Sequence, residues 1–426
     1  MACPSPVLHC FQRSFVARRI FHLLLCVVSM TIRSLSQQDI AADLFARYDE
    51  YVLRAVSTRM FTHKQMSQWI ASIQPRGAFR VERAGSSAEG RDILLLTVGQ
   101  GPTRVFLWSQ MHGDESTATM ALLDMLNFFA LSGDHPARKA ITEQLTVVMI
   151  PMLNPDGAER FQRRSSQLID INRDALQLRS PEARVLKETR DRLSPQFGFN
   201  LHDQSPRYSV GSSKKVAAIG LLAPALDEEK TDPPVRQRAK HVAASLAEIL
   251  ARFIPGHVAR YDDTFEPRAF GDNIQKWGTS TVLIESGGWP GDPEKMYLRK
   301  LNAVALLSVL VEIANGHYER SNIASYEDLP FNAERFYDVI VRGASIRTNG
   351  IVPPIVADVG INFESGPRSA KVSPDSTYAR IVDVGDLHTF GSFEDIDGTG
   401  IELDSTVVKM DRRILKSRLM ELIRKN

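Results

Sequence analysis

Apolar and polar residues follow two alternating patterns over most of the chain. Short apolar runs are separated by longer segments in which apolar residues recur about every three to four positions, the spacing of a helix. The strand-like runs are 104–110, 145–153, 197–203 and 279–286, and the helix-like segments are 116–133, 235–254 and 294–316. Strands that are apolar throughout are buried on both faces. The pattern therefore predicts an α/β fold, with a twisted, mainly parallel sheet and helices on both faces.

Two further features modify this picture. The runs 78–85 and 91–99 are joined by a polar connection containing glycine, which predicts an antiparallel hairpin and makes the sheet mixed. After about residue 325 the chain changes to β-rich runs broken by Gly, Pro, Asn and Asp. These runs are 336–343, 377–385 and 400–410. A helix is predicted over 411–426 from the apolar face formed by Ile414, Leu415, Leu419, Leu422 and Ile423. Residues 326–426 are thus expected to form a small β-rich accessory domain ending in a helix.

The N-terminal segment is typical of a secretory signal peptide. Arginines precede the apolar stretch 20–30, which is too short to span a bilayer as a mature helix. A small-x-small sequence follows at Ser34–Ser36, and all three cysteines lie at or before Cys26. We predict a signal peptide over 1–36 and a secreted or periplasmic protein without disulfides in its folded part. An amphipathic N-terminal helix or a misplaced start codon is the alternative.

Composition excludes several classes of protein. The chain has 426 residues, of which 43% are apolar, so it can form a large core and is not disordered as a whole. Its net charge is only +2, and no dense Lys/Arg stripe is interleaved with aromatic residues, so nucleic acid is not expected as a partner. Beyond the N-terminal segment no run approaches the roughly 18 apolar residues of a membrane helix, so no membrane contact is expected in the mature form.

Candidate chemistry begins directly after the first predicted parallel strand. His112 and Glu115 stand where that strand ends, at the edge of an α/β sheet where ligands collect. A His with a Glu three residues later could hold a metal. Glu115 could equally favour a helix N-terminus by interacting with the helix dipole.

Three later segments add polar residues to apolar strands. The sequence NPDG at Asn154–Gly157 is a strong turn pattern, which leaves Arg163, Asn172 and Arg173 unexplained except by solvation. His202 closes a further strand, where a lone histidine is more often a satisfied, partly buried residue. Glu285 closes the last apolar strand before two glycines. A carboxylate at that position requires a partner.

In this order the segments resemble the M14 family of zinc carboxypeptidases over roughly residues 77–316. The pattern comprises His-x-x-Glu, NPDG, an Arg nine residues after Asn154, an Asn-Arg pair eighteen residues after it, then a His and a Glu that each close a strand. The sequence DINR stands where shorter bacterial members have DLNR. The resemblance implies the zinc carboxypeptidase fold, with residues 37–325 as the catalytic domain.

The resemblance also implies a role for each residue. One Zn²⁺ per chain would be bound by His112, Glu115 and His202, a ligand set that leaves a position for water. Glu285 would be the general base toward metal-activated water, and Arg163 would stabilise the oxyanion. Asn172 and Arg173 would bind the free C-terminal carboxylate of a peptide substrate. The implied reaction is hydrolysis of the C-terminal peptide bond.

Departures from the family pattern leave the substrate open. A tyrosine usually lies about twenty residues before the base, whereas Tyr261 lies 24 before Glu285, so Asp263, Glu266 or Arg268 are alternatives for covering the substrate. Asp263 and Asp272 could favour a basic terminal residue or merely pair with neighbouring cations. Two other functions remain open: a cell-wall muropeptide amidase of the same family, and an inactive homologue that binds carboxylated ligands.

Overall fold

The computed structural model describes Met1 and residues 40–347, 353–365, 377–404, 406–408 and 413–425. Two compact units are present, Met1–Glu50 and Tyr51–Asn426. The described part of the first unit is largely helical and leads into the short helix α2 (Tyr48–Tyr51). Apart from Met1, the predicted signal peptide lies outside the described residues and stays a prediction. No helix among the described residues is long and apolar enough to cross a membrane.

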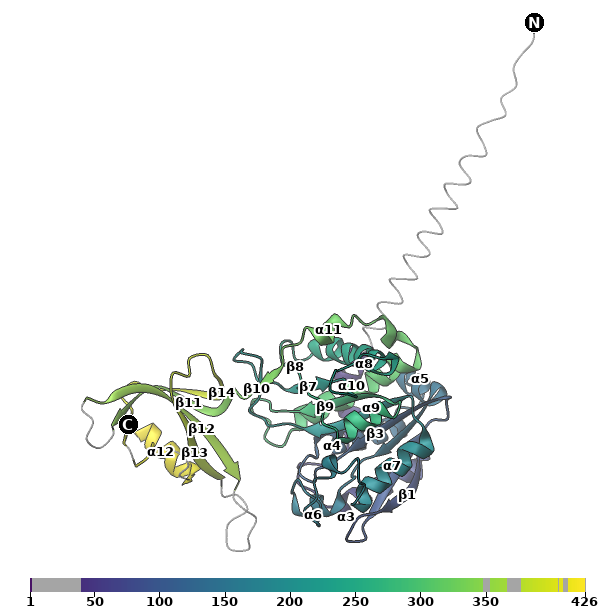
Figure 1. Ribbon diagram of the computed structural model, residues 1–426, viewed down its shortest axis with the longest axis horizontal. Helices are drawn as coiled ribbons and strands as arrows, with labels where there is room; N and C mark the ends of the chain where they lie inside the picture. Colours follow the sequence, from purple (N-terminus) through teal and green to yellow (C-terminus); the bar gives the residue numbers. More distant parts are fainter. Residues whose placement is uncertain (2–39, 348–352, 366–376, 405, 409–412, 426) are drawn as a thin grey trace. The chain divides into compact units, whose positions relative to one another are not determined.

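An eight-stranded sheet forms the centre of the second unit (Figure 1). Its strands are β1 (Arg80–Ser86), β2 (Asp92–Val98), β3 (Thr103–Ser109), β4 (Leu145–Ile150), β5 (Phe197–Asp203), β7 (Ile219–Leu222), β8 (Val258–Arg260) and β9 (Ser280–Ser286). Their order across the sheet is β1-β2-β4-β3-β5-β9-β7-β8. The four strongly apolar runs predicted from the sequence are β3, β4, β5 and β9, and they lie next to one another in the middle of the sheet. The predicted hairpin is β1 and β2, which pair antiparallel.

The direction of the strands is partly different from the prediction. The central strands β4, β3, β5 and β9 are parallel to one another, and β2 joins them antiparallel from the hairpin side. A second antiparallel pair, β7 with β9, lies away from the hairpin, where none was expected. The chain between β5 and β7 contains no helix that could return it to the starting edge of the sheet. It therefore turns back, and β7 runs opposite to β5 and β9.

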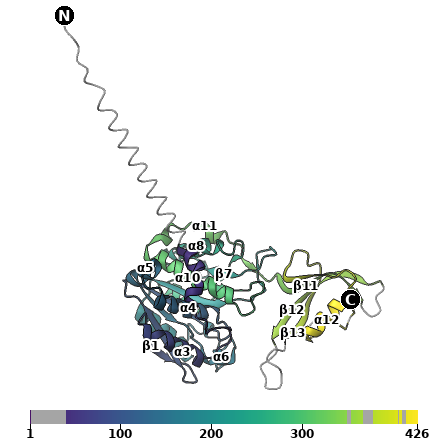
Figure 2. The ribbon, with the colours of Figure 1, turned by 180° about the vertical axis from the view of Figure 1, so that it is seen from behind.

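Helices cover both faces of this sheet, as predicted (Figure 2). Helix α10 (Met296–Ala314) contacts α4 (Thr117–Leu131), α5 (Pro136–Gln144) and α8 (Pro234–Ala251) in one layer. Helices α7 (Pro181–Leu193) and α9 (Phe270–Lys276) pack against a second apolar cluster that includes Phe106, Trp108, Val148 and Ile150 of the sheet. Further helices are α3 (His63–Ile73), α6 (Pro155–Arg160) and α11 (Ala324–Glu327). The sequence pattern did not predict α3, which begins at a capping box formed by Thr62 and Gln65.

A second sheet occupies the C-terminal region, in agreement with the predicted β-rich part. Its strands are β11 (Phe336–Arg347), β12 (Ile355–Ser365), β13 (Thr377–Gly385), β14 (Gly391–Asp397), β15 (Glu402–Asp404) and β16 (Ile414–Leu415), with α12 (Lys416–Lys425) closing the chain. Strands β12 and β14 were not predicted. A short strand β10 (Asn332–Ala333) precedes this sheet and pairs instead with β6 (Ser209–Val210). The boundaries 37–325 and 326–426 remain predictions.

The predicted helix over 411–426 is wrong at its start. Ile414 and Leu415 form β16, which pairs with the edge of β13 and so satisfies backbone groups that the edge would leave open. The helix begins only at Lys416. From this start Leu419 and Ile423 face the core, as predicted, whereas Leu422 is exposed on the opposite side.

Candidate metal centre

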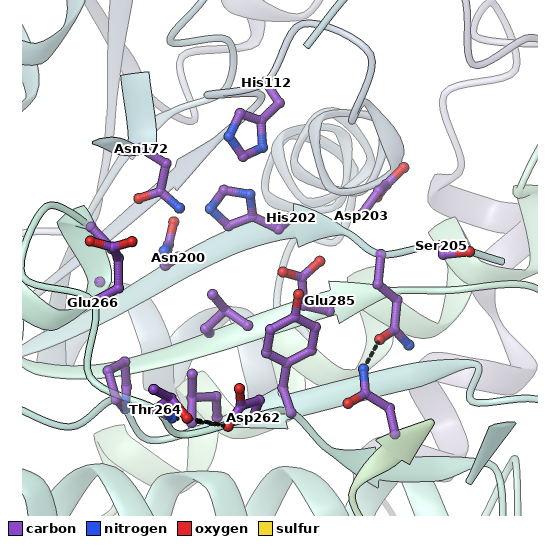
Figure 3. A pocket seen from close by; sticks show the side chains of 18 of the residues that line it. His112, Asn172, Asn200, His202, Asp203, Ser205, Asp262, Thr264, Glu266 and Glu285 are labelled. Carbon is purple, nitrogen blue, oxygen red and sulfur yellow. Dashed lines mark hydrogen bonds between the residues drawn. The ribbon is translucent and has the colours of Figure 1, made fainter. Parts of the chain in front are cut away.

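Three neighbouring strands end at the same edge of the central sheet and carry the candidate residues. Strand β5 lies between β3 and β9, and His202 near its end stands directly opposite Glu285 of β9. His112 and Glu115 follow the end of β3. Figure 3 shows His112, His202 and Glu285 around one pocket. Parallel strands deliver these side chains to one place because their carboxyl ends share an edge.

Glu115 lies between the two imidazoles. Its Oε1 is 2.7 Å from Nδ1 of His112, and its Oε2 is 2.8 Å from Nδ1 of His202. One ligand atom of each of the three residues lies within 4.8 Å of the other two. All three side chains are almost fully buried. The two Nδ1 atoms and the carboxylate therefore converge on a volume small enough for one cation.

Burial and charge shift the pKa values of these groups in different directions. Burial alone would raise the pKa of Glu115, but the two imidazoles, that of His112 foremost, hold it well below its ordinary value. Burial lowers the pKa of His202. Burial acts in the same direction on His112, but the carboxylates of Glu115 and Asp170 outweigh it and raise that pKa. The cluster thus keeps a charged carboxylate in a buried place where it needs a positive partner.

Asp170 supports the cluster from outside and was not singled out in the sequence, although it begins the DINR segment. Its Oδ1 is 3.1 Å from Nε2 of His112, the ring nitrogen that faces away from Glu115. Its Oδ2 accepts a hydrogen bond from Nε of Arg163 at 3.1 Å and forms an ion pair with Nη2 of the same guanidinium at 3.1 Å. Arg163 also reaches Glu115 Oε1 at 3.2 Å. A carboxylate on the outer nitrogen fixes the orientation of a ligating histidine.

The segment that holds His112 is packed tightly against NPDG. Gln110 adopts φ 51°, a left-handed conformation that costs a non-glycine residue about 1–3 kcal/mol and turns the chain sharply after β3. A Cβ atom on Gly113 would lie 2.1 Å from the carbonyl carbon of Gly157. Asn154 donates to Met111 O and accepts from Gly157 N, so it ties the two segments together. The NPDG sequence therefore starts helix α6, with Asn154 as its N-cap, rather than forming only a turn.

Asn172 and Arg173 lie on a short 3-10 helix, η2 (Ile171–Arg173), that borders the same pocket. Asn172 is buried and accepts a hydrogen bond from Phe270 N through Oδ1, which directs its amide nitrogen elsewhere. Arg173 remains partly exposed, and its Nε is 3.2 Å from Oε2 of Glu266. Glu266 therefore orients the guanidinium at the edge of the pocket.

Glu285 is buried, and its Oε2 has no hydrogen-bond partner among the described residues. Burial raises its pKa well above the ordinary value, and the charges of Glu115 and Asp203 act in the same direction. A carboxylate without a partner in a closed place fits a group that exchanges a proton with something bound in the pocket.

The pocket has a volume of about 700 Å³, and its lining includes His112, Glu115, Arg163, Asn172, Arg173, His202 and Glu285. All seven candidate residues named from the sequence thus border one cavity. Tyr261 and Asp272 also line it. Asp263 does not, because it pairs with Lys230, Arg236 and Arg260. Of the two aspartates considered for a basic preference, only Asp272 therefore faces the cavity.

The donor set fits a zinc ion. Two neutral imidazoles and one carboxylate are a known three-residue ligand set for catalytic zinc, which keeps a further position open. Nδ1 of His202 is directed into the cluster by its contact with Glu115, and its Nε2 is buried without a partner among the described residues. The outer nitrogen of His112 has its carboxylate in Asp170.

The chain is similar in sequence to known carboxypeptidases. The sequence model of the zinc carboxypeptidase family Peptidase_M14 matches residues 66–210. Carboxypeptidase 2 of Trichophyton rubrum is 24% identical over 256 residues, which cover 58% of this chain and 45% of that protein. Cytosolic carboxypeptidase 6 of Mus musculus is 27% identical over 124 residues, 26% of this chain and 23% of that protein. A metallo-carboxypeptidase from Burkholderia cenocepacia superposes with a TM-score of 0.48 at 18% identity, covering 60% of this chain and 70% of that one.

The chain spans less than half the length of these curated relatives. The matched segment contains the three clustered residues as well as Arg163, Asn172 and Arg173, whereas Glu285 lies beyond it and is brought to the cluster by the pairing of β9 with β5. The family match and the named relatives agree with the pattern first seen in the sequence. Residues 66–210 thus match the M14 family of zinc carboxypeptidases, and the named relatives that the chain resembles are carboxypeptidases.

Proposed function

We propose that this protein is a zinc-dependent carboxypeptidase that hydrolyses the C-terminal peptide bond of peptides. One Zn²⁺ per chain would be held by His112, Glu115 and His202. Bound there, the ion would supply a Lewis acid that activates water and polarises the peptide carbonyl. Support comes from the convergence of both Nδ1 atoms on the two oxygens of Glu115.

Glu285 is proposed as the general base and acid. Its buried carboxylate takes a proton from the attacking water and returns it to the leaving amine. Its raised pKa favours the proton-carrying form, and a nearby divalent cation would oppose that shift. The unpartnered Oε2 is the atom available for this exchange.

Arg163, Asn172 and Arg173 are proposed to bind and stabilise the substrate. Arg173 can hold a terminal carboxylate in a bidentate pair, and the amide of Asn172 adds a hydrogen bond. Arg163 already reaches Glu115 and Asp170, so it can stabilise negative charge that develops on the carbonyl oxygen beside the cluster. A clamp for a free carboxylate makes the protein an exopeptidase.

The observation that carries the proposal is the position of Glu285 opposite His202 at the open side of the His-Glu-His cluster. The test measures release of C-terminal residues before and after chelation and for Glu285→Gln. That variant should bind zinc with little change and lose at least ~10²-fold in turnover. Glu182 is the matched control, because it too is buried, has a raised pKa and an unpartnered oxygen, but does not line the pocket.

Glu182→Gln should retain turnover. Full activity of Glu285→Gln, or activity that survives complete removal of metal, would contradict the proposal. An inactive carboxylate-binding homologue is disfavoured because every position of the proposed machinery has a competent residue. A secreted or periplasmic location remains part of the proposal, and the N-terminal sequence of the exported protein tests it.

A further inference from the structure

The segment that leads into the C-terminal sheet forms part of the pocket wall. Asn332, Ala333 and Glu334 line the same cavity as the metal cluster. The zinc carboxypeptidase match ends at residue 210, so these residues lie outside it. Gln204 and Tyr208 line the cavity as well.

Several backbone contacts fix this segment in place. Strand β10 pairs antiparallel with β6, with Asn332 opposite Val210. Just before it, Phe331 O accepts from Gly211 N at 2.8 Å, and Pro330 O accepts from Arg260 N at 2.9 Å. The segment is therefore joined to the catalytic region on two sides, and Glu334 follows directly after these pairings.

A side-chain contact connects the segment to the strand ends that carry the chemistry. Asn332 donates through Nδ2 to Gln204 Oε1 at 2.8 Å. Gln204 lies two residues after His202, and its backbone N donates to Ser286 O, next to Glu285, at 3.1 Å. Its amide nitrogen donates to Ala217 O at 3.0 Å. Asn332 is thus held in a fixed position relative to the proposed base.

The segment lies at the end of the pocket away from the carboxylate clamp. Figure 3 shows Asn172 and Glu266 to one side of His202 and Glu285, and Ser205 to the other side. A peptide whose C-terminus is held at Asn172 and Arg173, with its scissile bond at Glu285, must extend toward that other side. The residues before the scissile bond therefore pass the wall that contains Gln204 and the segment 332–334.

Charge at this wall is negative. Glu334 is exposed, and no described Lys or Arg forms an ion pair with it. Arg163 and Arg173 are the arginines among the lining residues, and no lysine lines the cavity in the described part of the chain. Burial, followed by the charges of Glu334 and Glu285, raises the pKa of the Tyr208 phenol, so both carboxylates act on Tyr208. A cation bound here would find a carboxylate and a hydroxyl.

We infer that residues 332–334 form a subsite for the part of the substrate before the scissile bond, and that Glu334 selects a cationic side chain there. This inference rests on the proposed function. It gives the start of the C-terminal region a direct part in substrate binding, and it makes Glu334 a specificity-determining residue.

The experiment compares three peptides with the same C-terminal residue and Lys, Gln or Glu before it. The zinc-loaded full chain, Glu334→Gln and Glu334→Lys are assayed for kcat/KM. The native protein should favour Lys over Glu roughly fivefold or more, as expected for a partly exposed ion pair. Glu334→Gln should bring the three values within about twofold, and Glu334→Lys should reverse the order. Glu143, an exposed glutamate on α5, provides the control Glu143→Gln, which should keep the native preference.

Two results would overturn the inference while leaving the proposed function intact. The native protein could cleave all three peptides equally, or Glu334→Gln could lower all three values by one common factor, which indicates a structural role. If the zinc-loaded native protein cleaves none of the peptides, the proposed function fails and the subsite fails with it.

Discussion

Replacing Asp170 by Asn tests whether the outer carboxylate tunes the metal cluster. The native carboxylate binds Nε2 of His112 through one oxygen and two nitrogens of Arg163 through the other. Asn keeps the shape and one acceptor oxygen, but it removes the charge and presents an NH₂ group to one of these donors. Loss of such an outer partner typically lowers metal affinity about 10–100-fold, which corresponds to ~1.4–2.7 kcal/mol. We expect Asp170→Asn to lie in this range because the carboxylate is largely buried and little screened by water.

The assay is a competition for Zn²⁺ between the metal-free protein and a chromophoric chelator at neutral pH. Asp156→Asn is the matched control. Asp156 is fully buried and is bound by Ser87, Glu89 N and Arg91, but it has no contact with the metal cluster. The control should lower stability and leave zinc affinity within about twofold of the native value.

The two variants together separate orientation of a ligand from general loosening. If Asp170→Asn bound zinc as tightly as the native protein, His112 would not depend on its outer partner, and the supporting role given to Asp170 would be wrong. If both variants lost affinity equally, the effect would come from destabilisation alone.

Three further predictions concern stability. Asp124→Asn leaves the buried Arg299 guanidinium without its carboxylate and should lower the free energy of unfolding in urea by ~3–5 kcal/mol. The Asp124→Asn/Arg299→Met double variant should recover much of this loss. A loss below ~1 kcal/mol in the single variant would contradict the prediction. Burial raises the pKa of Asp272 to about 6, so ionisation of this carboxyl destabilises the folded state increasingly from about pH 4 to pH 7. The stability of Asp272→Asn relative to the native protein should therefore be greater at pH 8 than at pH 4 by ~1–3 kcal/mol. An equal stability difference at both pH values would refute burial of the charge as the cause. Gly113→Ala should lower the stability of the fold by ~1–3 kcal/mol and weaken zinc binding, because the new Cβ would clash with the Gly157 backbone. An unchanged melting temperature would show that the two segments can move apart without cost.

Much of the fold could be predicted because its central strands are apolar on both faces. The apolar runs that form β3, β4, β5 and β9 are almost completely buried in the structure. An apolar run of this kind predicts a strand covered on both faces, and here helices provide that cover. Strand direction was less predictable. The antiparallel pairing of β7 with β9, and the capture of Ile414 and Leu415 by the edge of β13, depend on which backbone edges are free in three dimensions.

By itself, the sequence determined the residue types of the site and their order, because the proposed metal chemistry requires the side chains of His112, Glu115 and His202 wherever the chain brings them. Only the tertiary structure decided which groups serve one another. In the structure, Asp170 contacts the outer nitrogen of His112, and Asp263 lies outside the pocket lining and pairs with cations. Glu334 lines the pocket wall. These relations join residues far apart in the chain, and contact distances of a few ångströms are set by strand register and packing, which no local pattern of residues encodes.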